Sequence, residues 1–176
     1  MMAGALLGLA AFALLFLFEA CKCSSVKEGR ERKNPWFYIG MLLLAAAWVI
    51  TVIFSGKSPM PWLAIGVALT ILAIAWYVKV LGTTSQENTY TENHLKVPVI
   101  RTGPYSRTRH PGIWCFAAVA AGITVIAPES WPVNLLFTLI NLLYCILQDR
   151  YFFPVYIEGY DIYKQEVPFC IPGRKH

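Results

Sequence analysis

The chain has 176 residues, of which 57% are hydrophobic and 14% are charged. The charged residues fall outside long apolar stretches instead of being spread along the chain, which argues against a soluble globular domain. The formal net charge of +5 is therefore expected to set membrane topology and to attract anionic lipid headgroups, with no nucleic acid as a partner.

Four long apolar blocks predict the membrane-spanning helices of an all-α integral membrane protein. About 20 apolar residues are needed to cross a bilayer, so each of the first three blocks predicts one span. The fourth block is long enough for two helices, and its polar, proline-bearing interruption at residues 127–132 predicts a tight turn between them. The sequence therefore predicts about five transmembrane helices, the last two forming a hairpin. The blocks are residues 3–20, 36–54, 61–81 and 112–153.

The first and fourth blocks each have an unusual feature. The first block lacks the basic region that precedes the apolar core of a secretory signal, so we expect it to remain as a helix. The first helix of the hairpin, residues 112–126, is short for a full span. A tilt, an upstream extension or partial burial within the protein would account for that length.

The positions of Lys and Arg predict the orientation in the membrane. With five spans, only Lys57 falls on one side, and the positive-inside rule makes the other side cytosolic. The N-terminus is then outside and the C-terminus cytosolic, in the endoplasmic reticulum of a eukaryote or the inner membrane of a bacterium. The residues on the cytosolic side are Lys22, Lys27, Arg30, Arg32, Lys33, Lys79, Lys96, Arg101, Arg107, Arg109, Arg150, Lys164, Arg174 and Lys175.

The five cysteines form no paired framework and show no metal-ligand spacing. Cys115 and Cys145 lie in apolar helices, where a free cysteine usually behaves as a small buried hydrophobe. Cys21 and Cys23 lie at the cytosolic end of the first helix. They are either palmitoylated or unmodified interfacial thiols.

The longest polar stretch, residues 82–111, leads into the fourth helix. Its second half has fixed backbone points, because Gly103-Pro104 makes a turn and a residue before proline is kept out of the helical region. Arg109 and His110 should therefore stand at the N-terminus of that helix, where anions are favoured. Binding of lipid phosphate alone is the simpler alternative.

A second polar group, Gln148-Asp149-Arg150, lies at the cytosolic end of the fifth helix. Ionisable residues in or beside a span are costly and are therefore candidates for function; simple pairing of Asp149 with Arg150 is the alternative. The hairpin should bring this group to the same membrane face as Arg109 and His110. We expect a charged pocket there, able to bind a soluble cofactor from one side and a lipid-like substrate from the other.

The C-terminal tail, residues 159–176, is expected to be an ordered cytosolic cap. A free tail would lack apolar anchors. The anchors in this tail are Tyr160, Tyr163, Val167, Pro168 and Phe169.

The segment containing Gly103-Pro104-Tyr105 and Arg109-His110-Pro111 resembles a motif of the membrane methyltransferases related to isoprenylcysteine carboxyl methyltransferase and the phospholipid methyltransferases. The resemblance continues through residues 148–150 to Tyr160, Tyr163 and Val167-Pro168, similar to that family's Glu-Glu-Arg and Tyr-x-x-Tyr ending. It covers residues 82–172. It divides the chain into three N-terminal transmembrane helices, residues 1–81, and a methyltransferase-like core, residues 82–176.

The resemblance implies methyl transfer from S-adenosylmethionine to a lipid-like or small amphipathic substrate at the membrane surface. This cofactor carries an ammonium, a sulfonium and a carboxylate, so its site needs both signs of charge. Methyl transfer itself needs mainly alignment. The resemblance implies catalytic roles for Arg109, His110 and Asp149. It implies cofactor binding by Gly103, Tyr105, Arg109, His110, Pro111, Gln148, Asp149, Tyr160 and Tyr163.

Three departures from the family pattern leave other functions open. Ile113 stands where the family has Tyr, Gln148 stands for an acidic residue, and Tyr156-Ile157 replaces Phe-Gly. A non-catalytic membrane subunit that keeps the scaffold and binds membrane-complex partners is one alternative. A reductase that uses NADPH is another, because sterol reductases share a similar Arg-His-Pro segment, although they carry more transmembrane helices.

Overall fold

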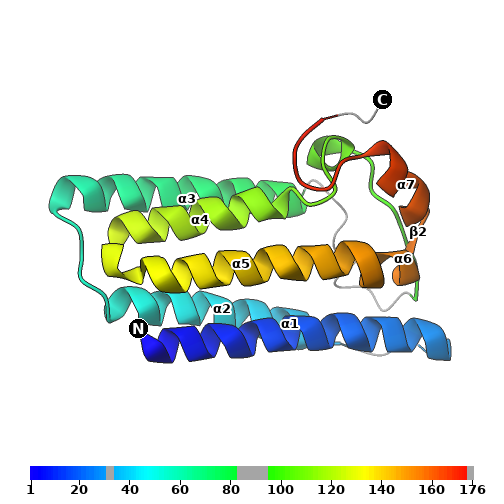
Figure 1. Cartoon of the computed structure of the whole chain (residues 1–176), viewed down its shortest axis with the longest axis horizontal. Coiled ribbons are helices and arrows are strands. Elements are labelled where there is room, and N and C mark those ends of the chain that lie inside the picture. Colours follow the sequence, from blue (N-terminus) through cyan, green and yellow to red (C-terminus); the bar gives the residue numbers. More distant parts are fainter. Residues whose placement is uncertain (31–33, 83–94, 174–176) are drawn as a thin grey trace.

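The computed structural model describes residues 1–30, 34–82 and 95–173 of the chain. Most of them are helical, as predicted, and the long helices lie beside one another along the long axis of the molecule (Figure 1). The long helices are α1 (Met2–Glu28), α2 (Trp36–Ile53), α3 (Met60–Gly82), α4 (Gly112–Ile126) and α5 (Trp131–Leu147). The shorter elements are β1 (Val97–Pro98), η2 (Gly103–Ser106), η3 (Pro128–Ser130), η4 (Gln148–Phe152), α6 (Phe153–Tyr156), β2 (Ile157–Glu158) and α7 (Tyr160–Glu166).

Within the described residues, four helical segments are long and apolar enough to cross a membrane. They are Met2–Glu28, Trp36–Ile53, Met60–Val80 and Pro128–Tyr156. The helix α4 is also apolar but has only 15 residues. The turn predicted between the last two long helices is confirmed, because the 3-10 turn η3 joins α4 to α5.

The helix α1 is longer than the apolar block that predicted it. No glycine or proline interrupts residues 9–28, so the helix continues to Glu28. Lys22 and Lys27 therefore lie within its last turns and do not follow its end. It ends at Gly29, whose left-handed backbone (φ 64°) is typical of a helix C-terminus. The basic residues Arg32, Lys33, Arg174 and Lys175 lie outside the described residues.

Helices α1 and α2 pack as one pair, α3 and α4 as another, and α5 contacts both pairs (Figure 1). The core between them contains Phe12, Leu44 and Phe137, each at most 3% exposed. A Cβ atom at Gly8 would lie 1.9 Å from the Phe137 ring, so α1 can approach α5 this closely only with glycine there. The apolar contacts therefore fix the N-terminal helix against the fifth.

The outward faces of the helices carry many large apolar side chains. On α3, Trp62, Ile71 and Leu72 are 59%, 61% and 66% exposed. Exposed apolar surface of this extent marks a face that contacts lipid or another protein.

The two ends of the bundle differ in structure. The N-terminus, the link between α2 and α3, and η3 lie together at one end (Figure 1). There the Ser58 hydroxyl donates a hydrogen bond to the Val125 carbonyl (2.6 Å). At the opposite end, η2, η4 and α7 gather, and β1 pairs in parallel with β2, with Val97 opposite Ile157 (Figure 1). This short ladder was not predicted, and it joins the loop before α4 to the chain that follows α5.

Candidate functional site

The tail and the segment before α4 are joined by backbone hydrogen bonds. The backbone N–H of Arg109 donates to the Pro168 carbonyl (3.0 Å), and that of His110 donates to the Phe169 carbonyl (3.1 Å). The Thr108 hydroxyl adds a bond to the Phe169 carbonyl (2.9 Å). These bonds set Arg109 and His110 directly before Gly112, where α4 begins, as predicted. The expected ordered cap is present over residues 159–173.

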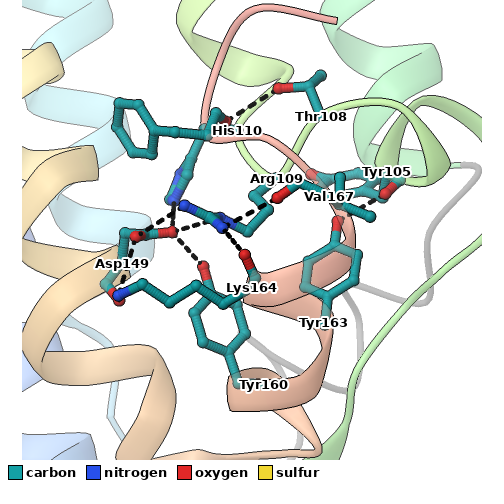
Figure 2. Close-up of polar contacts among 10 residues, drawn as sticks. Tyr105, Thr108, Arg109, His110, Asp149, Tyr160, Tyr163, Lys164 and Val167 are labelled. Carbon is teal, nitrogen blue, oxygen red and sulfur yellow. Dashed lines mark hydrogen bonds and ion pairs between the residues drawn. The ribbon is translucent and has the colours of Figure 1, made fainter. Parts of the chain in front are cut away.

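A buried ion pair between Arg109 and Asp149 is the centre of the site (Figure 2). Arg109 Nε lies 2.8 Å from Asp149 Oδ1, and Nη2 donates to Oδ2 (3.1 Å). Arg109 Nη1 donates to the carbonyls of Lys164 (2.6 Å) and Val167 (2.9 Å). A buried ion pair is tolerated only when further hydrogen bonds satisfy it, and the tail supplies them.

Three more groups converge on the Asp149 carboxylate (Figure 2). His110 Nε2 lies 3.4 Å from Oδ1, the Tyr160 hydroxyl donates to Oδ1 (2.7 Å), and Lys164 Nζ lies 3.3 Å from Oδ2. Burial lowers the pKa of His110, so its imidazole is neutral near pH 7. Burial also raises the pKa of Tyr160, which keeps its proton. The two formal cations Arg109 and Lys164 thus face one carboxylate.

The His110 ring is held between two aromatic side chains. It stacks on Phe153, with ring centroids 5.5 Å apart and planes 7° from parallel, and it contacts Phe169 at 4.9 Å. His110 Nε2 and Arg109 Nε are buried atoms with no hydrogen-bond partner among the described residues, although both lie near Asp149. Arg109 Nε lies 2.8 Å and His110 Nε2 lies 3.4 Å from Asp149 Oδ1, so both atoms face the carboxylate.

The helix that carries Asp149 widens into the π-helical turn η4 just after α5. Pro154 has no backbone N–H, so the regular helical bond to the carbonyl of Arg150 is missing. Turns of this kind are frequent at functional sites. The sequence prediction placed Asp149 on an ordinary helix end and missed this turn.

A second buried carboxylate, Glu19 of α1, lies close to the predicted site and was not predicted. It is fully buried. It accepts hydrogen bonds from the Tyr144 hydroxyl (2.9 Å), Gln148 Nε2 (2.6 Å) and the Tyr156 hydroxyl (2.8 Å). The available signal was a lone acidic residue within an apolar block, the same signal that singled out Asp149.

One cavity of about 660 Å³ extends from the helices to this site. Most of its wall is apolar and comes from α1 to α5, including Phe12, Leu15 and Phe116. Ile113, at the position where the resembled family has Tyr, also lines it. Six of the predicted site residues line the cavity: Tyr105, Arg109, His110, Gln148, Tyr160 and Tyr163.

The remaining predicted residues, Gly103, Pro111 and Asp149, are not among the residues that line the cavity. Gly103 starts η2 with a positive φ of 58°, and Pro111 caps α4. Asp149 contacts His110 and Arg109, so the predicted meeting of the loop and the foot of α5 is confirmed. Asp149 is absent from the described lining, however. The opposite charges therefore satisfy each other instead of standing open to the cavity.

Comparison of the chain with protein family models, with curated proteins and with solved structures finds no match.

Proposed function

We propose that this chain is a multi-pass membrane protein that transfers a methyl group from S-adenosylmethionine to a lipid-like or small amphipathic substrate. The observation that carries the proposal is the cavity, which joins an apolar wall to a polar end formed by Arg109, His110 and Gln148. An amphipathic molecule needs both environments in one continuous space.

The outer surface of the bundle supports membrane insertion. The exposed apolar side chains of α3 would be unfavourable in water and fit the hydrocarbon of a bilayer. We propose that five helices span the membrane. Helix α4 is the short one, since its 15 residues extend only about 22 Å against a hydrocarbon core of about 30 Å. The end that carries the ion-pair cluster is cytosolic, and Lys57 is on the outer side.

The polar end of the cavity has groups that suit S-adenosylmethionine. Arg109 and His110 line this end of the cavity, and guanidinium and imidazole N–H groups are donors that fit the carboxylate of the cofactor. The carbonyl Oε1 of Gln148 is an acceptor, which fits its ammonium. When bound, S-adenosylmethionine supplies a methyl group on a positively charged sulfur.

The residues of the chain have three tasks in this function. Arg109 and His110 bind and orient the cofactor, and Asp149 holds both of them in place. Tyr105, Tyr160 and Tyr163 close the wall. The tail covers the polar end and excludes water, while the apolar wall aligns the substrate chain, and alignment is the main requirement of methyl transfer.

A non-catalytic membrane subunit is the second candidate, and one observation favours it. Both oxygens of Asp149 already contact Arg109, Tyr160 or Lys164, so no free carboxylate is offered at this point of the cavity. Such a subunit would keep the fold and bind membrane-complex partners without binding the cofactor.

Titration of purified protein in detergent with S-adenosylmethionine tests the proposal, with NADPH titrated in parallel. We expect saturable binding of S-adenosylmethionine, at least tenfold weaker in His110→Ala and unchanged in Lys57→Ala, since removal of a bond to a charged group costs about 1.5 to 3 kcal/mol. Transfer of labelled methyl to a panel of amphipathic lipids is the second stage. A wild-type protein that binds no S-adenosylmethionine contradicts the proposal, and co-purifying partners would then support the subunit.

A further inference from the structure

The second buried carboxylate acts on the same cavity through its neighbours. Glu19 does not line the cavity, and its side chain is fully buried between α1, α5 and α6. Gln148, which does line the cavity, is held by Glu19 through a 2.6 Å hydrogen bond from Nε2. Tyr144 also lines the cavity and donates to Glu19, so any effect of Glu19 on a bound molecule passes through Tyr144 and Gln148. Of these two, Gln148 has a second polar atom that it can present to a bound molecule.

The hydrogen bonds around Glu19 all run in one direction. Tyr144, Gln148 and Tyr156 each donate, and the two carboxylate oxygens accept. In the structure Gln148 turns its NH₂ group toward Glu19, with Nε2 2.6 Å from Oε1. Its carbonyl Oε1 then points away from Glu19, and among the described residues it has no hydrogen-bond donor.

The chemistry of the cavity wall follows from this orientation. Gln148 is only 4% exposed, so its Oε1 is a nearly buried acceptor at a wall that is otherwise mostly apolar. This acceptor has no donor among the described residues, and a bound molecule with an N–H group would satisfy it. The Gln148 carbonyl oxygen can accept from an ammonium group but not from a carboxylate, which has no proton to donate.

We propose that Glu19 is a positioning residue that fixes the Gln148 amide so that its carbonyl oxygen receives an ammonium group of the molecule bound in the cavity. The inference rests on the proposed function for the role of the bound molecule, and it adds a residue from the N-terminal half to the site. Residue 148 is not acidic, and Asp149 does not line the cavity. In this role Glu19 of α1 acts on the cavity indirectly, through the Gln148 amide.

Binding of two matched amphiphiles tests the proposal without any methyl transfer. The probes are a long-chain primary amine and a carboxylate of the same chain length, each brominated at the chain end so that it quenches tryptophan fluorescence. Trp48 lines the cavity, and Trp48→Phe identifies the part of the signal that comes from there. The measured quantity is the ratio of the two dissociation constants for protein in detergent at neutral pH.

We expect the wild-type protein to prefer the amine, and Glu19→Gln to reduce that preference about tenfold. The double variant Glu19→Gln with Gln148→Glu keeps one carboxylate and one amide in contact, and it should restore the preference. Thr51→Val is the matched control, because Thr51 is also fully buried and polar but does not line the cavity. It should leave the ratio unchanged.

Two results would overturn the inference. The first is an unchanged ratio in a folded Glu19→Gln variant. The second applies if Glu19→Gln does not fold, in which case the double variant should recover both the fold and the preference for the amine. A double variant that folds without this preference, or that still fails to fold, rejects the role of the pair. Failure of the proposed function is seen separately, as a wild-type protein that prefers the amine but binds no S-adenosylmethionine.

Discussion

The two buried carboxylates of this molecule are stabilised in different ways. Asp149 is surrounded by the cations of Arg109 and Lys164, with His110 and Tyr160 beside them. Glu19 accepts hydrogen bonds from three neutral donors, and a cation of the same helix, Lys22, lies near it. The ion pair of Asp149 fixes the tail and the segment before α4 to η4, whereas Glu19 holds the NH₂ group of Gln148 and leaves its carbonyl oxygen pointing elsewhere. Asp149 therefore holds the segments of the site together, and Glu19 sets which polar atom of Gln148 faces the cavity.

The largest expected effect comes from removing the ion pair. Asp149→Ala leaves Arg109 buried without a counter-charge, and we expect a loss of about 3 to 5 kcal/mol in the free energy of unfolding. Denaturant unfolding in mild detergent measures it. The control is Glu166→Ala, which breaks the exposed pair with Arg101. A loss for Asp149→Ala no larger than for that control would show that the buried pair does not hold the tail to α5.

The hydroxyl groups that donate to each carboxylate give a sharper comparison. The Tyr156 hydroxyl donates to Glu19 Oε2, for which the described residues offer no second donor, so Tyr156→Phe should cost about 2 kcal/mol. Tyr160→Phe should cost only about 1 kcal/mol, because Asp149 Oδ1 also contacts Arg109 and His110. The two variants remove the same atom in the same unfolding assay. The reverse order would contradict the assignment of roles.

The protonation of His110 should make the ion-pair cluster sensitive to acid. Burial lowers the pKa of His110 in the folded chain, whereas in the unfolded chain it titrates near 6.5. Below about pH 6.5 the unfolded state therefore binds a proton that the folded state does not, and stability falls by at most about 1.4 kcal/mol per pH unit from this group. Unfolding curves between pH 7 and pH 5 measure the slope. His110→Phe should flatten it, and an unchanged slope would assign it to other groups.

The smallest effect is expected at the surface of the tail. Arg101 pairs with Glu166, and both side chains are about half exposed. Exposed pairs contribute about 0 to 1 kcal/mol, and salt screens them. Arg101→Ala should therefore change stability little, and the change should disappear at high salt. A large loss would show that the contact of Arg101 with the Tyr163 ring, at 5.8 Å, stabilises the tail.

Much of the fold and part of the site followed from the sequence. Apolar blocks and prolines predicted the long helices and the turn at η3, because span length and turn chemistry are local properties. The meeting of His110 with Asp149 also followed, since a hairpin returns the chain to the level at which it began. The contacts of Asp149 with Tyr160 and Lys164 did not follow from the sequence, because these two residues reach Asp149 only through the path of the tail.

Glu19 shows the limit of the sequence argument. Its position within an apolar block was visible, but the contact of α1 with α5 that brings it to Gln148 depends on packing between distant segments. The widening of the helix at η4 was missed for a different reason. The widening depends on Pro154, five residues after Asp149, whose missing backbone N–H alters the turn before it.

The wall of the cavity comes from both halves of the chain, with Phe12 and Leu15 from the first half and Phe116 from the second. A polypeptide that begins at residue 82 would carry the whole motif region and still lack part of the wall of its binding chamber. Two separately expressed pieces, residues 1–82 and 83–176, should therefore recover ligand binding only when they are produced together, and swapping α1 between related chains would be a practical way to alter which molecules are accepted.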